Sequence, residues 1–336
     1  MTTAPVEVER SGVDWTSLLR RFGWTTGVWL LLVALIAFYA STIPSFGSFQ
    51  IASIAKNSLP LVYLAIAQAV IVIAGGIDLA VGSMLILANA VAAQLMDGRS
   101  FGVSLMVAVL VILMAAAING GVGWIIYVSK VPDIVVTLAT LFIIAGLALI
   151  VLPSPGGGTS DGFRAIFTGS TSGTGTNFWP ALVMMFVPMA AAARWMKHSR
   201  TGLSLYATGS DATAAYLSGV STLKAKVVSY AVGGAFAALG GLASLAITGS
   251  GESRFATASN FTLRSVAAIV LGGVALTGGV GSVVGAAAAG IVLFILSPVL
   301  SAMGVDPNTA QVIQGALIVL VMMVAGVVEL RRERGE

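Results

Sequence analysis

Hydrophobic residues gather in long runs along this chain, and short polar stretches separate them. Most of the runs approach the roughly 20 apolar residues that a helix needs to cross a bilayer. The pattern therefore predicts an all-α polytopic membrane protein with about ten transmembrane helices. The ten predicted segments are residues 25–43, 51–74, 77–96, 102–128, 133–152, 179–196, 225–248, 263–277, 280–303 and 309–328.

The composition agrees with a chain that folds in lipid. Hydrophobic residues make up 57% of it and charged residues 9%, whereas soluble domains carry about 25% charged residues. The mean hydropathy is +1.00. We therefore expect one membrane domain over residues 25–328. The net positive charge favours basic cytoplasmic loops rather than nucleic-acid binding.

The lysines and arginines predict an orientation. With a cytoplasmic N-terminus, twelve of the 17 fall in cytoplasmic connections, as the positive-inside rule requires. The cytoplasmic set is Arg10, Arg20, Arg21, Lys130, Arg194, Lys197, Arg200, Lys224, Lys226, Arg331, Arg332 and Arg334. The external set is Lys56, Arg99, Arg164, Arg254 and Arg264. Both termini, including a basic tail over residues 329–336, are then expected in the cytoplasm.

Residues 1–24 form a charged leader before the first apolar run. Within it, Trp15, Leu18, Leu19 and Phe22 recur at the spacing of one helix face. That spacing favours a short helix lying in the headgroup layer on the cytoplasmic side. A disordered basic leader is the alternative.

Two connections are long and hydrophilic. Residues 153–178 are mostly Gly, Ser, Thr and Pro, and the orientation places them outside, as a loop that cannot form its own core.

Residues 197–224 are basic and, by the same orientation, cytoplasmic. Inside them, Ser210 is a good N-cap, Asp211 adds negative charge to a first turn, and Gly219 is a good residue to follow a helix end. The sequence therefore predicts a short capped helix that either docks a partner or simply connects two spans.

Some chemistry is missing from the chain. It contains no Cys, no G-x-x-x-x-G-K-[ST] phosphate loop and a single histidine, His198, in a basic cluster at a membrane edge. These absences leave no thiolate site, no nucleotide cradle of that type and no second histidine for a metal site or relay. We therefore expect no enzyme, no metal site and no cofactor bound by this chain.

The predicted spans contain few polar side chains, namely Gln68, Asp78, Asn89, Gln94 and Asn119. Polar groups in such positions bridge helices or line a water-filled path. Gln68, Asn89 and Asn119 are the candidates for a translocation path. An ion-driven carrier would usually hold several buried carboxylates, whereas only Asp78 is an acidic residue away from the first position of a predicted span.

Asp78 follows two glycines within an apolar region. Gly75 and Gly76 can end one helix, and Asp78 can then cap the next by accepting from the backbone N–H groups near Ala80 and Val81. This interpretation makes Asp78 structural. Direct contact with hydroxyl groups of a transported solute is the alternative.

The cytoplasmic connection carries a recognisable pattern. Thr213, Ala214 and Ala215 are followed three residues later by Gly219. The run resembles the EAA-x3-G signature of bacterial ABC-importer permeases, with Thr in place of Glu. The resemblance implies that these residues, with Ser210 and Asp211, couple the chain to an ATPase.

Longer stretches resemble the ribose and simple-sugar permease family. "GGIDLAVGS" contains Gly75, Gly76, Asp78, Gly82 and Ser83, and it closely matches a stretch typical of that family, which commonly has Ser where Ala80 stands. "NGGVGWIIYVSKVPDIVVTLAT" resembles its middle, and "LRSVAAIVLGGVALTGGVGSVVGA" and "IQGALIVLVMMV" resemble its C-terminal part. The likeness covers roughly residues 50–328.

The resemblance implies a permease of about ten helices in a bacterial inner membrane. It implies pairing with a second copy or a paralogue, delivery of a pentose or hexose by a soluble binding protein outside, and two ATP-binding cassette subunits that hydrolyse ATP in the cytoplasm. Another small polar solute, such as a branched-chain amino acid, a nucleoside or a sugar-derived signal, is an alternative. A secondary carrier that needs no ATPase is a further one.

Overall fold

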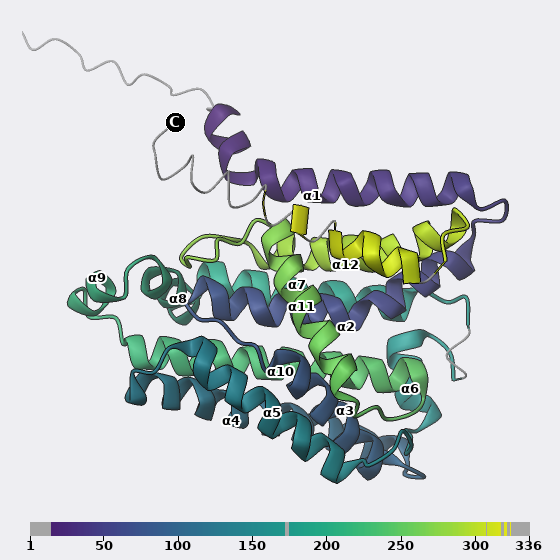
Figure 1. Ribbon diagram of the computed structural model, residues 1–336, viewed down its shortest axis with the longest axis horizontal. Coiled ribbons are helices and arrows are strands. Elements are labelled where there is room, and N and C mark those ends of the chain that lie inside the picture. Colours follow the sequence, from purple (N-terminus) through teal and green to yellow (C-terminus); the bar gives the residue numbers. More distant parts are fainter. Residues whose placement is uncertain (1–14, 172–174, 307, 317–318, 321–322, 324–336) are drawn as a thin grey trace, which may run out of the picture.

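The chain is a bundle of helices, as the apolar pattern predicts (Figure 1). The computed structural model describes residues 15–171, 175–306, 308–316, 319–320 and 323. Within these ranges it contains no strand, only one isolated bridge between Gly156 and Gly251. The helices are α1 (Trp15–Thr42), α2 (Ser48–Ile73), α3 (Val81–Met96), α4 (Phe101–Ser129), α5 (Asp133–Val151), α6 (Asp161–Thr168), α7 (Trp179–His198), α8 (Arg200–Ser210), α9 (Ala212–Leu217), α10 (Thr222–Thr248), α11 (Phe255–Leu271) and α12 (Val283–Ala302).

Seven of the described helices are long and apolar enough to cross a membrane, namely α1, α2, α4, α5, α7, α10 and α12. The shorter apolar helices α3 and α11 have 16 and 17 residues. Residues 308–316 are also helical, but most of the last predicted span, 309–328, lies outside the described residues. So do residues 1–14 and the predicted tail, while α1 begins inside the predicted leader, at Trp15.

The largest difference between the predicted and the observed helices is at α11. The apolar pattern predicts a helix over residues 263–277, whereas α11 begins eight residues earlier and ends six residues earlier. Thr257, Ser259 and Asn260 lower the hydropathy of its first half, so that half does not resemble a span. Arg264 therefore lies within a helix rather than in an external connection. Figure 1 shows α11 running obliquely across the other long helices.

Glycines bring the central helices close together. A Cβ atom on Gly234 of α10 would lie 2.4 Å from the carbonyl oxygen of Ala115 in α4. One on Gly241 would lie 2.4 Å from that of Leu85 in α3. Only glycine permits such backbone approach, which is the usual device of tightly packed membrane helices. The small-residue pattern of α10 is thus explained by packing.

The two ends of the bundle differ. Figure 1 shows α8 and α9 at one end, which the basic residues assign to the cytoplasm, and α6 at the other, external end. The external connection is more ordered than its composition predicts. α6 buries Phe163 and Phe167 in the main core, and Arg164 Nε donates to the carbonyl oxygen of Ala246 at 3.1 Å. The connection is ordered because its aromatic side chains pack into the core of the helix bundle.

Candidate functional site at the cytoplasmic helix break

The chain between α2 and α3, residues 74–80, is a helix break rather than a tight hairpin turn. Gly75 has a φ of +75°, in the left-handed region that favours glycine. Its N–H donates to the carbonyl oxygen of Val72, and the N–H of Gly76 donates to that of Ile71, both at 2.9 Å. This pairing closes a helix C-terminus. Gly75 and Gly76 therefore end α2, as predicted.

The break lies inside the bundle. The Tyr230 hydroxyl donates to the carbonyl oxygen of Ile77 at 3.0 Å, and Asp78 is only 1% exposed. Tyr230 stands eight residues into α10, which corresponds to about 12 Å along the helix axis. Non-helical backbone at that depth requires partners from the protein.

Asp78 supplies two of these contacts. Its Oδ1 accepts from the N–H of Ala80 at 2.7 Å, and its Oδ2 accepts from Asn119 Nδ2 at 3.1 Å. The predicted contact with Ala80 is therefore present. A bond to the N–H of Val81 is not among those formed, because Ala80, not Asp78, occupies the N-cap position of α3. Asp78 stabilises the break from a position two residues before the N-cap of α3.

We expect Asp78→Asn to keep most of the membrane abundance and transport. An asparagine can still accept from Ala80, and Oδ1 of Asn119 has no partner among the described residues. A flip of the Asn119 amide would therefore restore the second bond. Asp78→Leu loses both bonds and should lower abundance several-fold. Immunoblots of membranes and uptake assays measure both effects, and a well-folded but inactive Asn variant would show that the charge itself serves the solute.

A second carboxylate, Asp133 at the start of α5, gathers three donors. Its Oδ2 accepts from Lys226 Nζ at 2.5 Å and from the N–H of Ile77 at 3.3 Å, and at 2.9 Å it shares the single Tyr230 hydroxyl proton with the carbonyl oxygen of Ile77. Lys226 also donates to the carbonyl oxygen of Gly75 at 3.4 Å. These bonds tie α5, α10 and the break together. This cluster is not apparent from the sequence, because Lys226 lies among basic loop residues and nothing in the pattern pairs it with Asp133.

Four glycines form a junction between the break, the end of α8 and the connection before α12. The N–H of Gly279 donates to the carbonyl oxygen of Ile73 at 2.9 Å. A Cβ on Gly209 would lie 1.9 Å from that same oxygen, and one on Gly278 would lie 3.0 Å from Cα of Gly75. We call Gly75, Gly209, Gly278 and Gly279 the glycine junction. It holds the cytoplasmic connection in direct backbone contact with the break.

α9 is a capped helix, but its cap differs from the prediction. Asp211 is the N-cap, and its Oδ1 accepts from the N–H groups of Thr213 and Ala214 at 2.8 and 2.9 Å. Ser210 is instead the last residue of α8, since the chain forms two short helices where one is predicted. Gly219 has a φ of +83° and follows the helix end, as predicted.

The exposed side of α9 is apolar at its end. Tyr216 is 66% and Leu217 is 80% exposed, and Thr213 and Ala214 are also exposed. Ala215 is buried at 6% exposure, so its side chain does not lie on this exposed side of α9. Two large apolar side chains therefore project from this end of the bundle.

The predicted path residues are fully enclosed. Asn89 Nδ2 donates to the carbonyl oxygen of Gly241 at 3.0 Å, and its Oδ1 accepts from the N–H of Glu252 at 2.7 Å. With the bond from Asn119 to Asp78, these contacts favour the helix-bridging alternative for both asparagines. Gln68 is also fully buried, and its amide has no hydrogen-bond partner among the described residues.

The last two residues of the predicted motif lie against α11. The N–H of Gly82 donates to Thr262 Oγ1 at 3.1 Å, and a Cβ on Gly82 would lie 2.1 Å from the carbonyl oxygen of Ala258. Ser83 is fully buried, and its hydroxyl has no partner within the described part of the chain. Gly82 thus allows α11 to cross close to α3.

The arrangement joins an exposed surface to a buried break. α9 follows directly on α8, α8 ends in the glycine junction, and the junction contacts the break that Asp78 and Asp133 stabilise. α9 is therefore connected to the buried break through backbone contacts. Across the described residues, no group of three His, Cys, Asp or Glu side chains could hold a metal ion.

Apolar helices packed around a buried break, with a linked surface at one end, define a multi-pass membrane permease. The family described as "branched-chain amino acid transport system / permease component" matches residues 50–322, and the chain belongs to this family.

The chain is also similar to several curated permeases. It is 29% identical to the ribose import permease protein RbsC of Escherichia coli K12 over 313 residues, which cover 89% of this chain and 95% of that protein. It is 28% identical to the galactose/methyl galactoside import permease protein MglC of the same strain, over 87% of this chain and 91% of that protein. RbsC of Bacillus subtilis is 27% identical, over 96% and 98%. No solved structure shows significant similarity.

Proposed function

We propose that this chain is the membrane permease subunit of an ATP-driven importer that carries a simple sugar into a bacterial cell. Two ATP-binding cassette subunits would bind the cytoplasmic end, and a soluble binding protein would deliver the sugar outside. A second copy of the chain, or a paralogue, would complete the transmembrane pathway. The protein would lie in the bacterial inner membrane.

One observation carries the proposal. The similarity to ribose and galactose import permeases runs over nearly the whole chain and includes both the break and α9. The structure supports it through the exposed Tyr216 and Leu217, which suit the surface of an ATPase subunit. The family description names branched-chain amino acids, so an amino acid is the second candidate for the solute.

Reconstituted vesicles test this function. The chain is purified with its ATPase and binding-protein partners and supplied with labelled ribose, galactose or leucine. We expect uptake of a sugar that requires both ATP and the binding protein. Leucine uptake under the same conditions would shift the solute to amino acids, and uptake by the chain alone with an ion gradient would replace the importer with a secondary carrier.

The exposed residues Tyr216 and Leu217 of α9, which we call the coupling surface, give a sharper prediction. Leu217→Asp places a charge on the most exposed apolar residue of α9 without changing the bundle. We expect normal membrane abundance, loss of co-purification with the ATPase and an uptake rate reduced at least about tenfold, because charge at an interface core is strongly unfavourable. Leu217→Met is the matched control and should behave like the unmodified chain. Wild-type uptake by the Asp variant would remove α9 from the coupling surface.

A further inference from the structure

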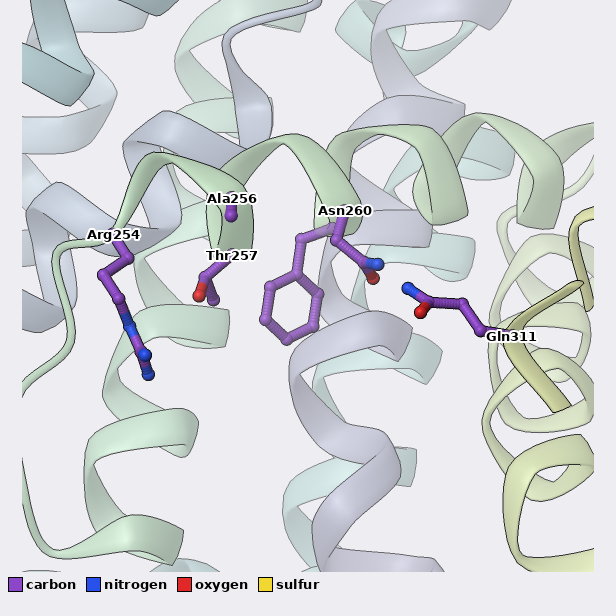
Figure 2. Close-up of a pocket in the computed structure, with 6 residues that line it drawn as sticks. Arg254, Ala256, Thr257, Asn260 and Gln311 are labelled. Atoms are coloured by element: carbon purple, nitrogen blue, oxygen red, sulfur yellow. The ribbon is translucent and has the colours of Figure 1, made fainter. Parts of the chain in front are cut away.

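A polar face runs along the first half of α11 and borders a cavity of about 410 Å³. Thr257, Asn260 and Phe261 line it, Arg254 lies at its edge just before the helix, and Gln311 approaches from the helical residues 308–316. Figure 2 shows Arg254 and Thr257 on the same side of α11, and the amides of Asn260 and Gln311 pointing toward one another. The volume lies within the range of about 300–1,000 Å³ for small-molecule pockets.

The polar face continues deeper along the same two helices. Arg264 donates to Gln314 Oε1 at 2.5 Å, and Gln314 Nε2 donates to Ser297 of α12 at 2.6 Å. Arg254 and Arg264 are ten residues apart, which corresponds to about 15 Å of helix. Two arginines and three amides therefore form one continuous polar strip.

This strip lies at the depth of the membrane interior. The ring of Phe255, which follows Arg254, stacks on Phe142 with ring centroids 5.6 Å apart. Phe142 is the middle residue of α5, a helix that is long and apolar enough to span the bilayer. The Arg254 side chain is nevertheless 69% exposed. A guanidinium group at that depth does not face lipid tails, so the cavity must face water or a second polar surface.

Arg254, the charged residue in the described cavity lining, is paired with a carboxylate. Arg254 Nη2 lies 2.6 Å from Glu252 Oε2, and its Nε also donates to that carboxylate. The remaining polar groups of the lining are a hydroxyl and two carboxamides, which are neutral.

We infer that this strip is a solute-contacting part of the translocation path, and that it takes a neutral polyhydroxylated ring rather than a zwitterionic amino acid. The inference rests on the proposed transport function. Carboxamides and a hydroxyl both donate and accept, which matches the hydroxyl groups of a sugar. Phe261 offers an aromatic face to the C–H face of the ring. A zwitterion would need a carboxylate partner for its ammonium group, and the described cavity lining contains no carboxylate, while the neighbouring Glu252 is already bound by Arg254.

The chain's lack of cysteine makes a direct test practical. Single variants Asn260→Cys and Met106→Cys are each assembled with the ATPase and binding protein in membrane vesicles. Met106 is the matched control because it lies five residues after the start of α4, as Asn260 does in α11, is 57% exposed, and stands on an apolar helix. Both are treated with a membrane-impermeant, positively charged methanethiosulfonate reagent. Labelling is repeated during turnover with ribose, galactose or leucine.

We expect Asn260→Cys to react at least about tenfold faster than Met106→Cys, because hydrocarbon excludes a charged reagent. A transported sugar should slow this reaction several-fold, leucine should not, and modification should stop uptake. Equal rates for the two cysteines, or a fast reaction that no sugar slows, would overturn the inference. Protection by leucine alone would overturn the choice of a neutral ring.

Two further measurements keep the result interpretable. Thr257→Cys replaces Asn260→Cys if the latter does not reach the membrane, since both positions line the same cavity. ATP-dependent sugar uptake by the unmodified chain is measured in parallel. Uptake without protection at either cysteine would refute the path assignment while the proposed function stands, whereas absence of uptake of either solute class would refute the function itself.

Discussion

Adding a single methyl group at Gly209 is expected to abolish uptake and strongly reduce the amount of folded protein. The new Cβ would lie 1.9 Å from the carbonyl oxygen of Ile73 and 2.6 Å from the backbone nitrogen of Gly279. Both atoms belong to the backbone, so no side-chain rotation can relieve the overlap. Overpacking in cores costs about 1–3 kcal/mol and occasionally more, and here the hydrogen bond between Gly279 and Ile73 is lost as well.

Gly121→Ala is the matched control for Gly209→Ala. Gly121 also lies in a helix, and a Cβ there would meet nothing within 4 Å. Alanine favours a helix more than glycine by about 1 kcal/mol, so this variant should be at least as stable as the unmodified chain. Fluorescence-detected size exclusion on heating, with uptake in parallel, measures both. Full abundance and uptake for Gly209→Ala would mean that the glycine junction is not a required contact.

The sequence predicts the parts of the fold that depend on which residues prefer lipid to water. α2, α4 and α10 lie within a few residues of their predicted segments, because long apolar runs determine which residues enter lipid. The short helix α9 and the glycine that follows it are likewise predicted, because helix caps depend on residues that are adjacent in the sequence. Local physics is sufficient for both.

The features that the sequence does not predict arise where distant segments meet. Asp133 and Lys226 are 93 residues apart, and each resembles an ordinary charge at a membrane edge. α11 carries polar residues that face a cavity, so a hydropathy pattern places the helix too late. Ala215 is small enough for a docking surface, yet its burial depends on how α9 packs against the bundle. These contacts join residues that are far apart in the chain, so the pattern of a single sequence does not reveal them.

The Asp133–Lys226 pair gives the other prediction of large effect. Both side chains are mostly enclosed, at 19% and 14% exposure, and Asp133 also accepts from Tyr230 and Ile77. Removing one partner of a fully buried pair costs about 3–5 kcal/mol, because the other charge is left uncompensated. We expect Asp133→Leu to approach the lower part of that range. Lys226→Met should cost less, because the carboxylate keeps two donors.

A double-mutant cycle separates pairing from general disruption. The double variant, with Asp133→Leu and Lys226→Met together, leaves no unpaired charge and should lose less stability than the two single losses added. Glu252→Gln is the control, since it breaks an ion pair whose arginine is 69% exposed and should cost no more than about 1 kcal/mol. Denaturant unfolding in detergent gives the free energies of unfolding. Strict additivity would mean that Asp133 acts only through Tyr230 and the N–H of Ile77, so that the break is stabilised by hydrogen bonds from neutral groups and Lys226 is a bystander.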